Sequence, residues 1–162
     1  MIFFNSKVAE FFLYANNFRG IMLFGFAFFK NRKEQIPQKW IMHEKTHIQQ
    51  YWESIIIWLG LMMLTTVVLA AGFSITVPIG LFIGIVLCGY YVHYYTEWLI
   101  RFVIQLRKGY GFKKAWMRGY ERVIFEQEAI DAENYRMTNF SKIFNAYNYW
   151  KRKSLFVQDE NK

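Results

Sequence analysis

Two long uncharged stretches stand out in the pattern of apolar and polar positions along the chain. Residues 55–73 and 77–95 each contain 19 residues and no Lys, Arg, Asp or Glu. A helix needs about 20 apolar residues to cross the hydrocarbon core of a bilayer. The short connector at 74–76 lies between Gly72 and Pro78, which are typical of a turn. The pattern therefore predicts a transmembrane helical hairpin, in preference to the buried hairpin of a water-soluble bundle.

The region before the hairpin predicts a short β segment followed by a helix. Residues 21–29 are apolar but too short to cross a membrane, and Gly25 would weaken a helix there. We therefore expect a strand, or a segment lying at the membrane interface, within residues 1–36. Pro37 suits the first turn of a helix, and we expect that helix to run without a break over 37–73.

The region after the hairpin predicts further helices and a tail. The second apolar stretch continues as an amphipathic helix, giving one helix over 77–108. Residues 112–140 have a helical pattern with an expected interruption at residues 118–119. Residues 141–162 form a basic, aromatic tail suited to a membrane surface. The chain thus predicts a mainly α-helical, single membrane-embedded domain.

Composition and charge support this interpretation. Hydrophobic residues make up 54% of the 162-residue chain, and the net charge is +8. Basic residues flank the hairpin on both sides but are absent from its connector: Lys30, Arg32, Lys33, Lys39 and Lys45 precede it, and Arg101, Arg107, Lys108, Lys113, Lys114, Arg118 and Arg122 follow it. By the positive-inside rule both termini are expected to be cytoplasmic. No nucleic-acid-binding motif is present, so we expect membrane lipids and no nucleic acid as the partner of these charges.

Two spaced pairs of side chains are expected to meet on the helices that flank the connector. Glu97 and Arg101 are four residues apart and can pair. His43 and His47 are also four residues apart, so both imidazoles can reach one metal ion. Glu44 lies about 100° further round the helix, where it can act as a general base.

This His-Glu-x-x-His pattern has the chemistry of a catalytic zinc site. Two neutral imidazoles are typical zinc ligands, and a neighbouring carboxylate can activate water. The pattern has only three fixed positions and arises often by chance. Two of the three histidines of the chain lie in it, however, and residues further along the chain offer a third ligand.

The third ligand is expected from the acidic segment at 125–135. On a helical wheel with 100° per residue, Phe125 is placed at 0°. Four apolar residues then share with Phe125 an arc of about 140°: Ala129, Ile130, Met137 and Phe140. Glu126 at about 100° and Glu133 at about 80° fall on this arc, whereas Glu128 at about 300° does not. A carboxylate on a core-facing arc is costly unless it is paired or binds a metal. We therefore predict Glu126 as the third ligand, with Glu128 as the alternative, and Glu133 as a hydrogen-bond acceptor for a ligand histidine.

Other residues are candidates for supporting roles. His93, near the end of the second apolar stretch, could orient a ligand or stabilise an oxyanion, although histidines there more often make interfacial hydrogen bonds. Tyrosine and arginine residues that flank Glu126 are candidates for the oxyanion: Tyr120, Arg122, Tyr135 and Arg136. Glu128 and Asp131 are otherwise expected to face solvent, and Gln49 and Gln50 are assigned no chemistry.

The motifs HEKTHIQQ and FEQEA resemble those of gluzincin zinc metallopeptidases. They are most similar to membrane-embedded proteases of the CAAX-prenyl-protease and heat-shock-protease type, whose downstream pattern E-x-x-A-D provides the third zinc ligand. Glu126 and Ala129 match its first two fixed positions, whereas Ile130 stands where that pattern has Asp. From residue 21 to 135 the chain also resembles small uncharacterised bacterial membrane proteins of Bacteroidetes type, which carry HE-x-x-H-x-x-QQ and FEREA.

The resemblance implies a multi-pass zinc metalloendopeptidase of the bacterial inner membrane. His43, His47 and Glu126 would bind Zn²⁺, and Glu44 would activate water to hydrolyse peptide bonds near the cytoplasmic face. In gluzincins a strand upstream of the motif helix pairs with the peptide substrate, a role that falls to residues 21–29. The substrate would be a peptide or a membrane protein. The alternative function is a non-catalytic, zincin-like subunit or scaffold of a larger membrane complex.

Overall fold

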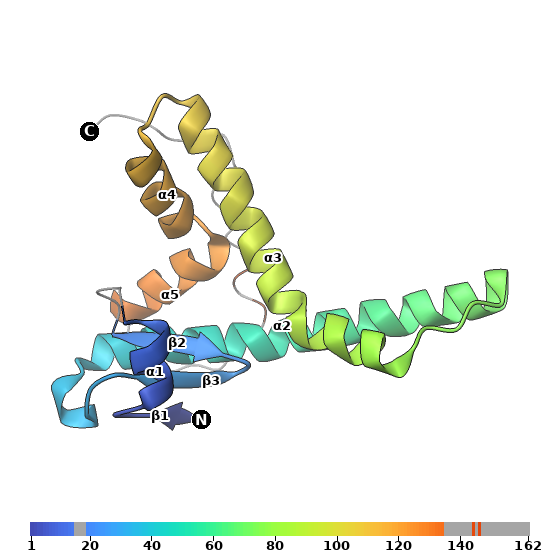
Figure 1. Ribbon diagram of the computed structural model, residues 1–162, viewed down its shortest axis with the longest axis horizontal. Helices are drawn as coiled ribbons and strands as arrows, with labels where there is room; N and C mark the ends of the chain where they lie inside the picture. Colours follow the sequence, from blue (N-terminus) through green and yellow to red (C-terminus); the bar gives the residue numbers. More distant parts are fainter. Residues whose placement is uncertain (15–18, 135–143, 145, 147–162) are drawn as a thin grey trace.

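The computed structural model describes residues 1–14, 19–134, 144 and 146, and two long helices organise it (Figure 1). Helix α2 extends over Gln38–Phe73 and helix α3 over Ile79–Arg107. Each begins directly after a proline, because proline fixes φ near its helical value and lacks the N–H that a first turn leaves unbonded. Ser74 ends α2 with φ 55°. These helices confirm the two long helices expected at 37–73 and 77–108.

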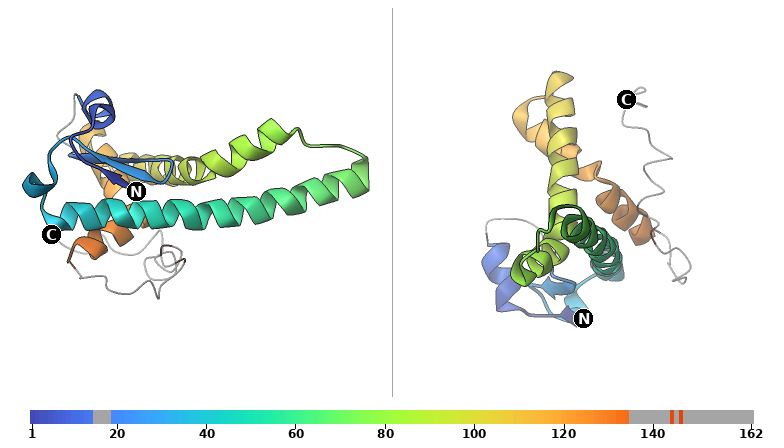
Figure 2. Two further views of the ribbon diagram at one scale, coloured as in Figure 1. Left: turned by 90° about the horizontal axis from the view of Figure 1, so that it is seen from below. Right: turned by 90° about the vertical axis from the view of Figure 1, so that its right-hand side faces the viewer.

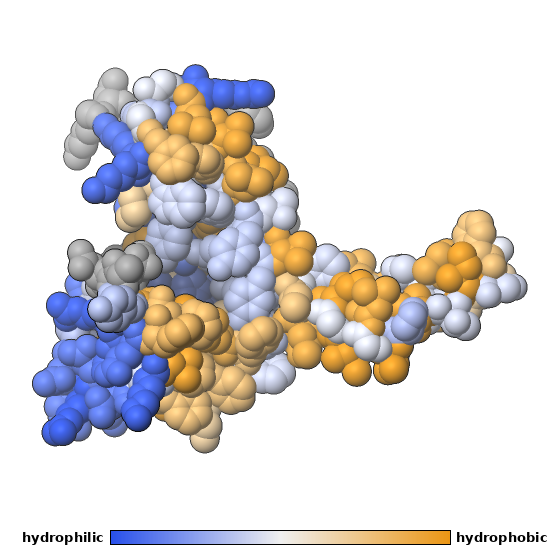
Figure 3. Space-filling view, in the orientation of Figure 1, coloured by the Kyte–Doolittle hydropathy of each residue, from blue (hydrophilic) through white to orange (hydrophobic). Residues whose placement is uncertain are grey.

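The two long helices have unusually exposed apolar surfaces. In the most apolar 18-residue window of α2 only 6% of the residues are buried, and in that of α3 only 17%. The core helix of a soluble protein would bury most of such a window. Both helices are long and apolar enough to cross a membrane, and Figure 3 shows the projecting part of the hairpin covered mostly by hydrophobic residues.

A small sheet packs against the first half of α2 (Figures 1 and 2). It contains β1 (Ile2–Phe3), β2 (Gly20–Leu23) and β3 (Phe26–Phe29) in the order β1-β3-β2, with the short helix α1 (Lys7–Phe12) between the first two in sequence. β1 is parallel to β3, and β2 is antiparallel to it. A 3₁₀ turn, η1 (Lys33–Gln35), leads into α2.

The expected β segment is therefore two strands instead of one. Phe24 and Gly25 have φ of 49° and 78° and form the two-residue turn between β2 and β3. Two successive positive φ values suit a hairpin turn whose twist matches that of its strands. Gly25, which the sequence suggested as a weak point, is the residue that makes the turn.

The third-ligand region forms two helices, α4 (Phe112–Glu121) and α5 (Ile124–Asn134). Their break lies at residues 122–123, so the interruption expected at 118–119 is wrong in position. Gly119 lies within α4, and its missing side chain lets α4 approach the backbone of Phe102, where a Cβ would lie 3.0 Å from Phe102 Cα. The expected continuation to residue 140, and all of the expected tail except Phe144 and Ala146, lie outside the described residues.

The start of α5 is held by α3. The Glu97 carboxylate accepts hydrogen bonds from the Ile124 N–H at 3.2 and 3.3 Å and from Arg101 Nε at 2.6 Å. The expected Glu97–Arg101 pair is confirmed, and it also satisfies an N–H of the first turn of α5, which no residue within a helix can do. Glu97 is buried, so this contact fixes where α5 begins.

Candidate metal centre

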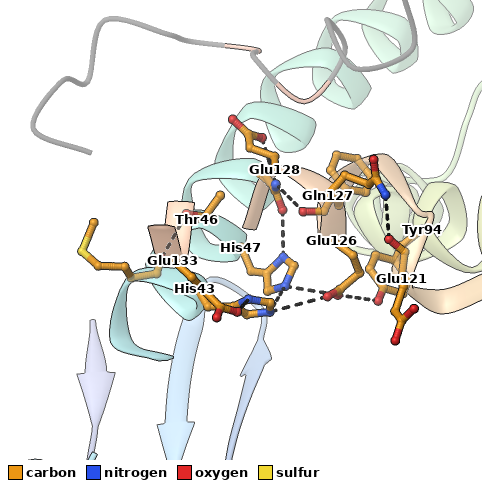
Figure 4. A network of polar contacts seen from close by, with 12 residues as sticks. His43, Thr46, His47, Tyr94, Glu121, Glu126, Gln127, Glu128 and Glu133 are labelled. Atoms are coloured by element: carbon orange, nitrogen blue, oxygen red, sulfur yellow. Dashed lines mark hydrogen bonds and ion pairs between the residues drawn. The ribbon is translucent and has the colours of Figure 1, made fainter. Parts of the chain in front are cut away.

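The histidines of α2 and the first turn of α5 come together in the interior. His43 Nε2 and His47 Nε2 are 3.1 Å apart. Glu126 Oε1 lies 3.2 Å from His47 Nε2, and Glu126 Oε2 lies 3.5 Å from His43 Nε2. Figure 4 shows the three side chains pointing toward one another. All three are buried, and their ligand atoms lie within 4.8 Å of one another.

These separations fit a single tetrahedral ion. With ligands about 2.0–2.1 Å from Zn²⁺, two tetrahedral ligand atoms are about 3.3 Å apart. The separations His43 Nε2–His47 Nε2 of 3.1 Å and His47 Nε2–Glu126 Oε1 of 3.2 Å are close to that value, and the second carboxylate oxygen, Oε2, lies 3.5 Å from His43 Nε2. Glu126 Oε2 is also buried and makes no hydrogen bond within the described part of the chain. A buried carboxylate oxygen without a hydrogen bond is costly, and a metal ion would satisfy it. The group can therefore hold a metal ion.

His43 is oriented by the end of α5. Its Nδ1 donates a hydrogen bond to Glu133 Oε1 at 2.8 Å. A carboxylate only accepts, so the ring proton lies on Nδ1 and the lone pair of Nε2 faces His47 and Glu126. A carboxylate on the outer nitrogen of a ligand histidine fixes both its tautomer and its orientation. The role predicted for Glu133 agrees with this contact.

His47 is oriented by an amide that is itself held on both sides. His47 Nδ1 lies 2.8 Å from Gln50 Oε1. Gln50 Nε2 donates to Glu128 Oε2 at 2.9 Å and to the carbonyl of Phe125 at 3.0 Å. Because both of these partners only accept, the amide cannot be flipped, and its oxygen must accept from His47 Nδ1–H. Nε2 of His47 is thereby left as a metal ligand.

Two tyrosines of α3 close the other side of the group. The Tyr94 hydroxyl donates to Glu126 Oε1 at 2.6 Å. The Tyr90 hydroxyl lies 3.3 Å from His47 Nδ1 and is buried. The hydroxyls therefore touch the group from a third helix, and they limit how far Glu126 can move.

The pKa values of Glu126 and His47 depend on each other. Burial alone would raise the pKa of Glu126, but the charge of His47 and the close polar contacts with both histidines hold it well below its ordinary value. Burial would likewise lower the pKa of His47, but Glu126 raises it to about 9. Without an ion, a proton on His47 therefore balances the Glu126 carboxylate. A divalent ion would replace that proton.

Glu44 lies beside the group without being part of it. Burial raises the pKa of Glu44, an effect that His47 and His43 partly oppose. On the sheet side, β2 approaches the carboxylate closely, and a Cβ on Gly20 would lie 3.1 Å from Glu44 Oε1 and 2.7 Å from the ring of Phe29. The glycine thus makes room for β2 beside the carboxylate. A buried carboxylate with a raised pKa suits a general base near neutral pH.

The remaining candidates are spread over several places. Tyr120 hydrogen-bonds with Glu126, and burial first and then Glu126 raise the pKa of its hydroxyl well above the ordinary value. His93 packs edge-on against the ring of Phe125, 5.1 Å between centroids, and is not among the metal-binding group. Arg122 caps the end of α4. Tyr135 and Arg136 lie outside the described residues.

The expected solvent exposure of Glu128 is wrong. Its exposed fraction is 4%, and it bonds Gln50, whereas Ile130 on the supposed core-facing arc is 36% exposed. α5 packs against α2 and α4 and buries residues on more than one face, which a single arc cannot describe.

Sequence reasoning missed Gln50, Tyr90 and Tyr94 as parts of the site. Gln50 carried a usable signal, because a residue three positions after His47 shares its helix face. Tyr90 and Tyr94 carried a weaker signal. They lie four residues apart in an apolar helix, and a buried tyrosine hydroxyl usually makes a hydrogen bond. Neither signal identifies the group that the side chain contacts.

Comparisons with models of protein families, with curated proteins and with solved structures found no match for this chain.

Proposed function

We propose that the protein is a membrane-bound zinc metallopeptidase that hydrolyses peptide bonds near the cytoplasmic face of a bacterial inner membrane. The observation that carries this proposal is the buried triangle of His43, His47 and Glu126 with Glu44 beside it. Two imidazoles and one carboxylate are the ligand set of a catalytic zinc site, which leaves a fourth position open. The hydrolase assignment also draws on the resemblance of the two motifs to gluzincins.

The contacts around the three proposed ligands determine which atom each of them would offer to the ion. A Zn²⁺ ion in this site would supply Lewis acidity toward a carbonyl and lower the pKa of water. His43 and His47 offer Nε2 because Glu133 and Gln50 hold their Nδ1 protons. Glu126 offers its carboxylate from α5.

Glu44 is the proposed general base. In the reaction it takes a proton from the attacking water and returns it to the amine of the leaving peptide. Its burial and raised pKa favour uptake of that proton. Tyr120 is the proposed donor to the developing oxyanion, because its hydroxyl stays protonated and lies at Glu126.

The edge of β2 that faces away from β3 is an argument for a peptide substrate. Lys30 N–H bonds the carbonyl of Arg19 at 3.1 Å, and antiparallel bonding alternates along a strand. Gly20 and Met22 therefore direct their backbone N–H and C=O groups away from β3. A peptide added along this edge as a further strand would pass the Glu44 carboxylate.

The test is zinc content and peptide cleavage of the full-length protein purified in detergent. Glu44→Gln should keep one zinc per chain but lose about 10²- to 10⁴-fold in cleavage rate of a peptide mixture read by mass spectrometry. Glu53→Gln is the matched control, because Glu53 is also a buried carboxylate of α2 but bonds Gln49 at 2.7 Å. It should cleave at the wild-type rate.

Two results would decide against the peptidase. If wild type and Glu44→Gln release the same peptides while both hold zinc, the site is structural and the non-catalytic subunit is the better assignment. If the wild type holds no zinc after purification in zinc-containing buffer, the metal site itself is wrong.

A further inference from the structure

The second half of α3, together with α4, runs crosswise to α2. In the right panel of Figure 2 the hairpin is viewed nearly end-on, whereas the yellow part of α3 is seen from the side. Figure 1 shows the same departure of α3 from α2. If α2 crosses a membrane along its normal, this part of α3 lies parallel to the membrane plane.

The exposed side of this crosswise segment is apolar. Leu99, Ile100, Val103 and Leu106 are 53%, 49%, 40% and 38% exposed. On a helical wheel they share an arc of about 120°. A helix surface that faces water normally carries polar residues there.

Helix α4 extends the same surface with aromatic rings. Phe112 and Trp116 are exposed, and their ring centroids are 6.0 Å apart. The arm face is defined by these residues of both helices: Leu99, Ile100, Val103, Leu106, Phe112 and Trp116. Figure 3 shows a hydrophobic area at the end of α3 and α4, on the side toward which the hairpin projects.

The arm face is continuous with the apolar surface of the hairpin. Val92 and Tyr95, one to two turns before Leu99, are 55% and 60% exposed and extend the same side of α3 toward the connector. A single exposed strip thus runs from the apolar stretch of α3 onto the arm. This continuity favours lipid, which already suits the hairpin surface, over a separate protein partner.

Basic residues border the arm face. Arg107 and Lys113 are exposed beside the arm face. Lys114 and Arg118 lie on the other side of α4, over the ring of Tyr110, at 5.1 and 4.2 Å from its centroid. Apolar residues with an aromatic ring on one side and Lys and Arg around them are typical of a helix lying in the headgroup region of an anionic membrane.

We propose that the arm formed by residues 96–107 of α3 and by α4 lies flat in the interface of an anionic lipid bilayer. This inference rests on the membrane placement in the proposed function. The arm face contacts the acyl-chain boundary, and the basic residues beside it, Arg107 and Lys113, contact anionic headgroups. Because α4 leads directly into α5, the arm also ties Glu126 to the membrane surface.

The test uses spin labels on the full chain in vesicles of phosphatidylethanolamine and phosphatidylglycerol. Cys88, the free cysteine of the described residues, is replaced by Ser, and single cysteines are introduced at Val103 or Phe112. The matched control on the other side of α4 is Lys114, and the reference within the hairpin is Leu64. Collision rates with oxygen, which concentrates in lipid, are compared with those of a water-soluble nickel complex.

The labels at Val103 and Phe112 should resemble the label at Leu64, with a ratio of oxygen to nickel collisions several-fold higher than at Lys114. If Leu64 is in lipid but both arm labels resemble Lys114, the arm inference fails and the membrane placement stands. If both arm labels collide with neither reagent, protein covers the arm face and the inference also fails. If Leu64 itself is reached by nickel, the membrane placement is wrong.

Discussion

The two halves of α2 differ in which side chains they bury. In this helix, which lies wholly within the described part of the chain, nine of the ten buried residues precede residue 55, and seven of those nine are polar. After residue 55 the helix is almost entirely apolar, yet Met62 is its one buried residue. One continuous helix therefore buries polar groups at one end and exposes apolar groups at the other.

This contrast indicates that the two halves of α2 have different surroundings. In the first half, polar side chains can be buried because they bond one another across α2, α3 and α5. In the second half, apolar side chains can be exposed at low cost only if the surroundings are apolar as well. A helix surface that faces water normally carries polar residues, so the second half of α2 departs from that pattern.

Breaking the polar half should have the largest effect. His47→Ala removes a candidate metal ligand and takes from the buried Glu126 carboxylate the imidazolium that balances its charge. We expect loss of bound zinc, and a fall of about 3–5 kcal/mol in the free energy of unfolding of the metal-free protein. Elemental analysis and chemical unfolding in detergent measure the two effects. His93→Ala is the control, since His93 packs on Phe125 apart from the group, and equal zinc loss in both variants would contradict the assignment.

Breaking the apolar half should have the next largest effect. Leu64 is 63% exposed in the middle of the apolar stretch, and an arginine there should cost about 2.5–3.5 kcal/mol on insertion into a membrane. Leu64→Ile should cost almost nothing. A glycosylation-mapping assay of hairpin insertion compares the variants. Equal insertion of Leu64→Arg and wild type would show that this half of the helix is not surrounded by lipid.

Loss of the amide that orients His47 should have a smaller effect within the polar half of α2. Gln50→Ala removes the acceptor for His47 Nδ1–H and leaves Glu128 without that donor. We expect zinc affinity to fall about 10- to 100-fold, as measured by competition with a chromophoric chelator. Gln49→Ala is the neighbouring control, because Gln49 bonds Glu53 instead. A similar loss in both variants would argue against a specific role for Gln50.

The smallest expected effect is the pH dependence of stability and of zinc affinity. The pKa of His47 is raised from 6.5 to about 9 in the metal-free protein. Its charged form therefore stabilises the metal-free fold fully below pH 6.5, and this contribution is lost as the pH rises through about 9. Zinc binding near pH 7 should release about one proton, and affinity should rise with pH until about 9. Calorimetry in buffers of different ionisation enthalpy counts the proton; a count of zero would contradict the raised pKa.

Local pattern was enough for some parts of this fold. The sequence pattern was enough to predict both long helices, because each contains an uncharged stretch and begins after a proline. The spacing of four residues was enough to place His43 and His47 on one helix face. The Glu97–Arg101 pair was also visible in this way. The arc that selected Glu126 had partial success, because it misplaced Glu128 and Ile130 on a helix that buries more than one face.

Contacts across long sequence separations decided the rest. The break before α5 lies where Glu97 of α3 meets the Ile124 N–H, and no periodicity in residues 112–140 marks that point. Gly25 lies in a turn because β2 and β3 pair as an antiparallel hairpin. Tyr94 reached Glu126 from inside an apolar helix.

Which side chains share a helix face follows from the amino-acid sequence alone, because an α-helix repeats every 3.6 residues whatever surrounds it. The pairing of His43 with His47 on one face of α2 and the apolar length of the hairpin could therefore be predicted. Only the tertiary structure brought Glu126 within 3.2 Å of His47 and turned Gln50 and Glu133 onto the outer ring nitrogens. These contacts depend on how α2, α3 and α5 pack, and packing depends on the shapes of all three helices together.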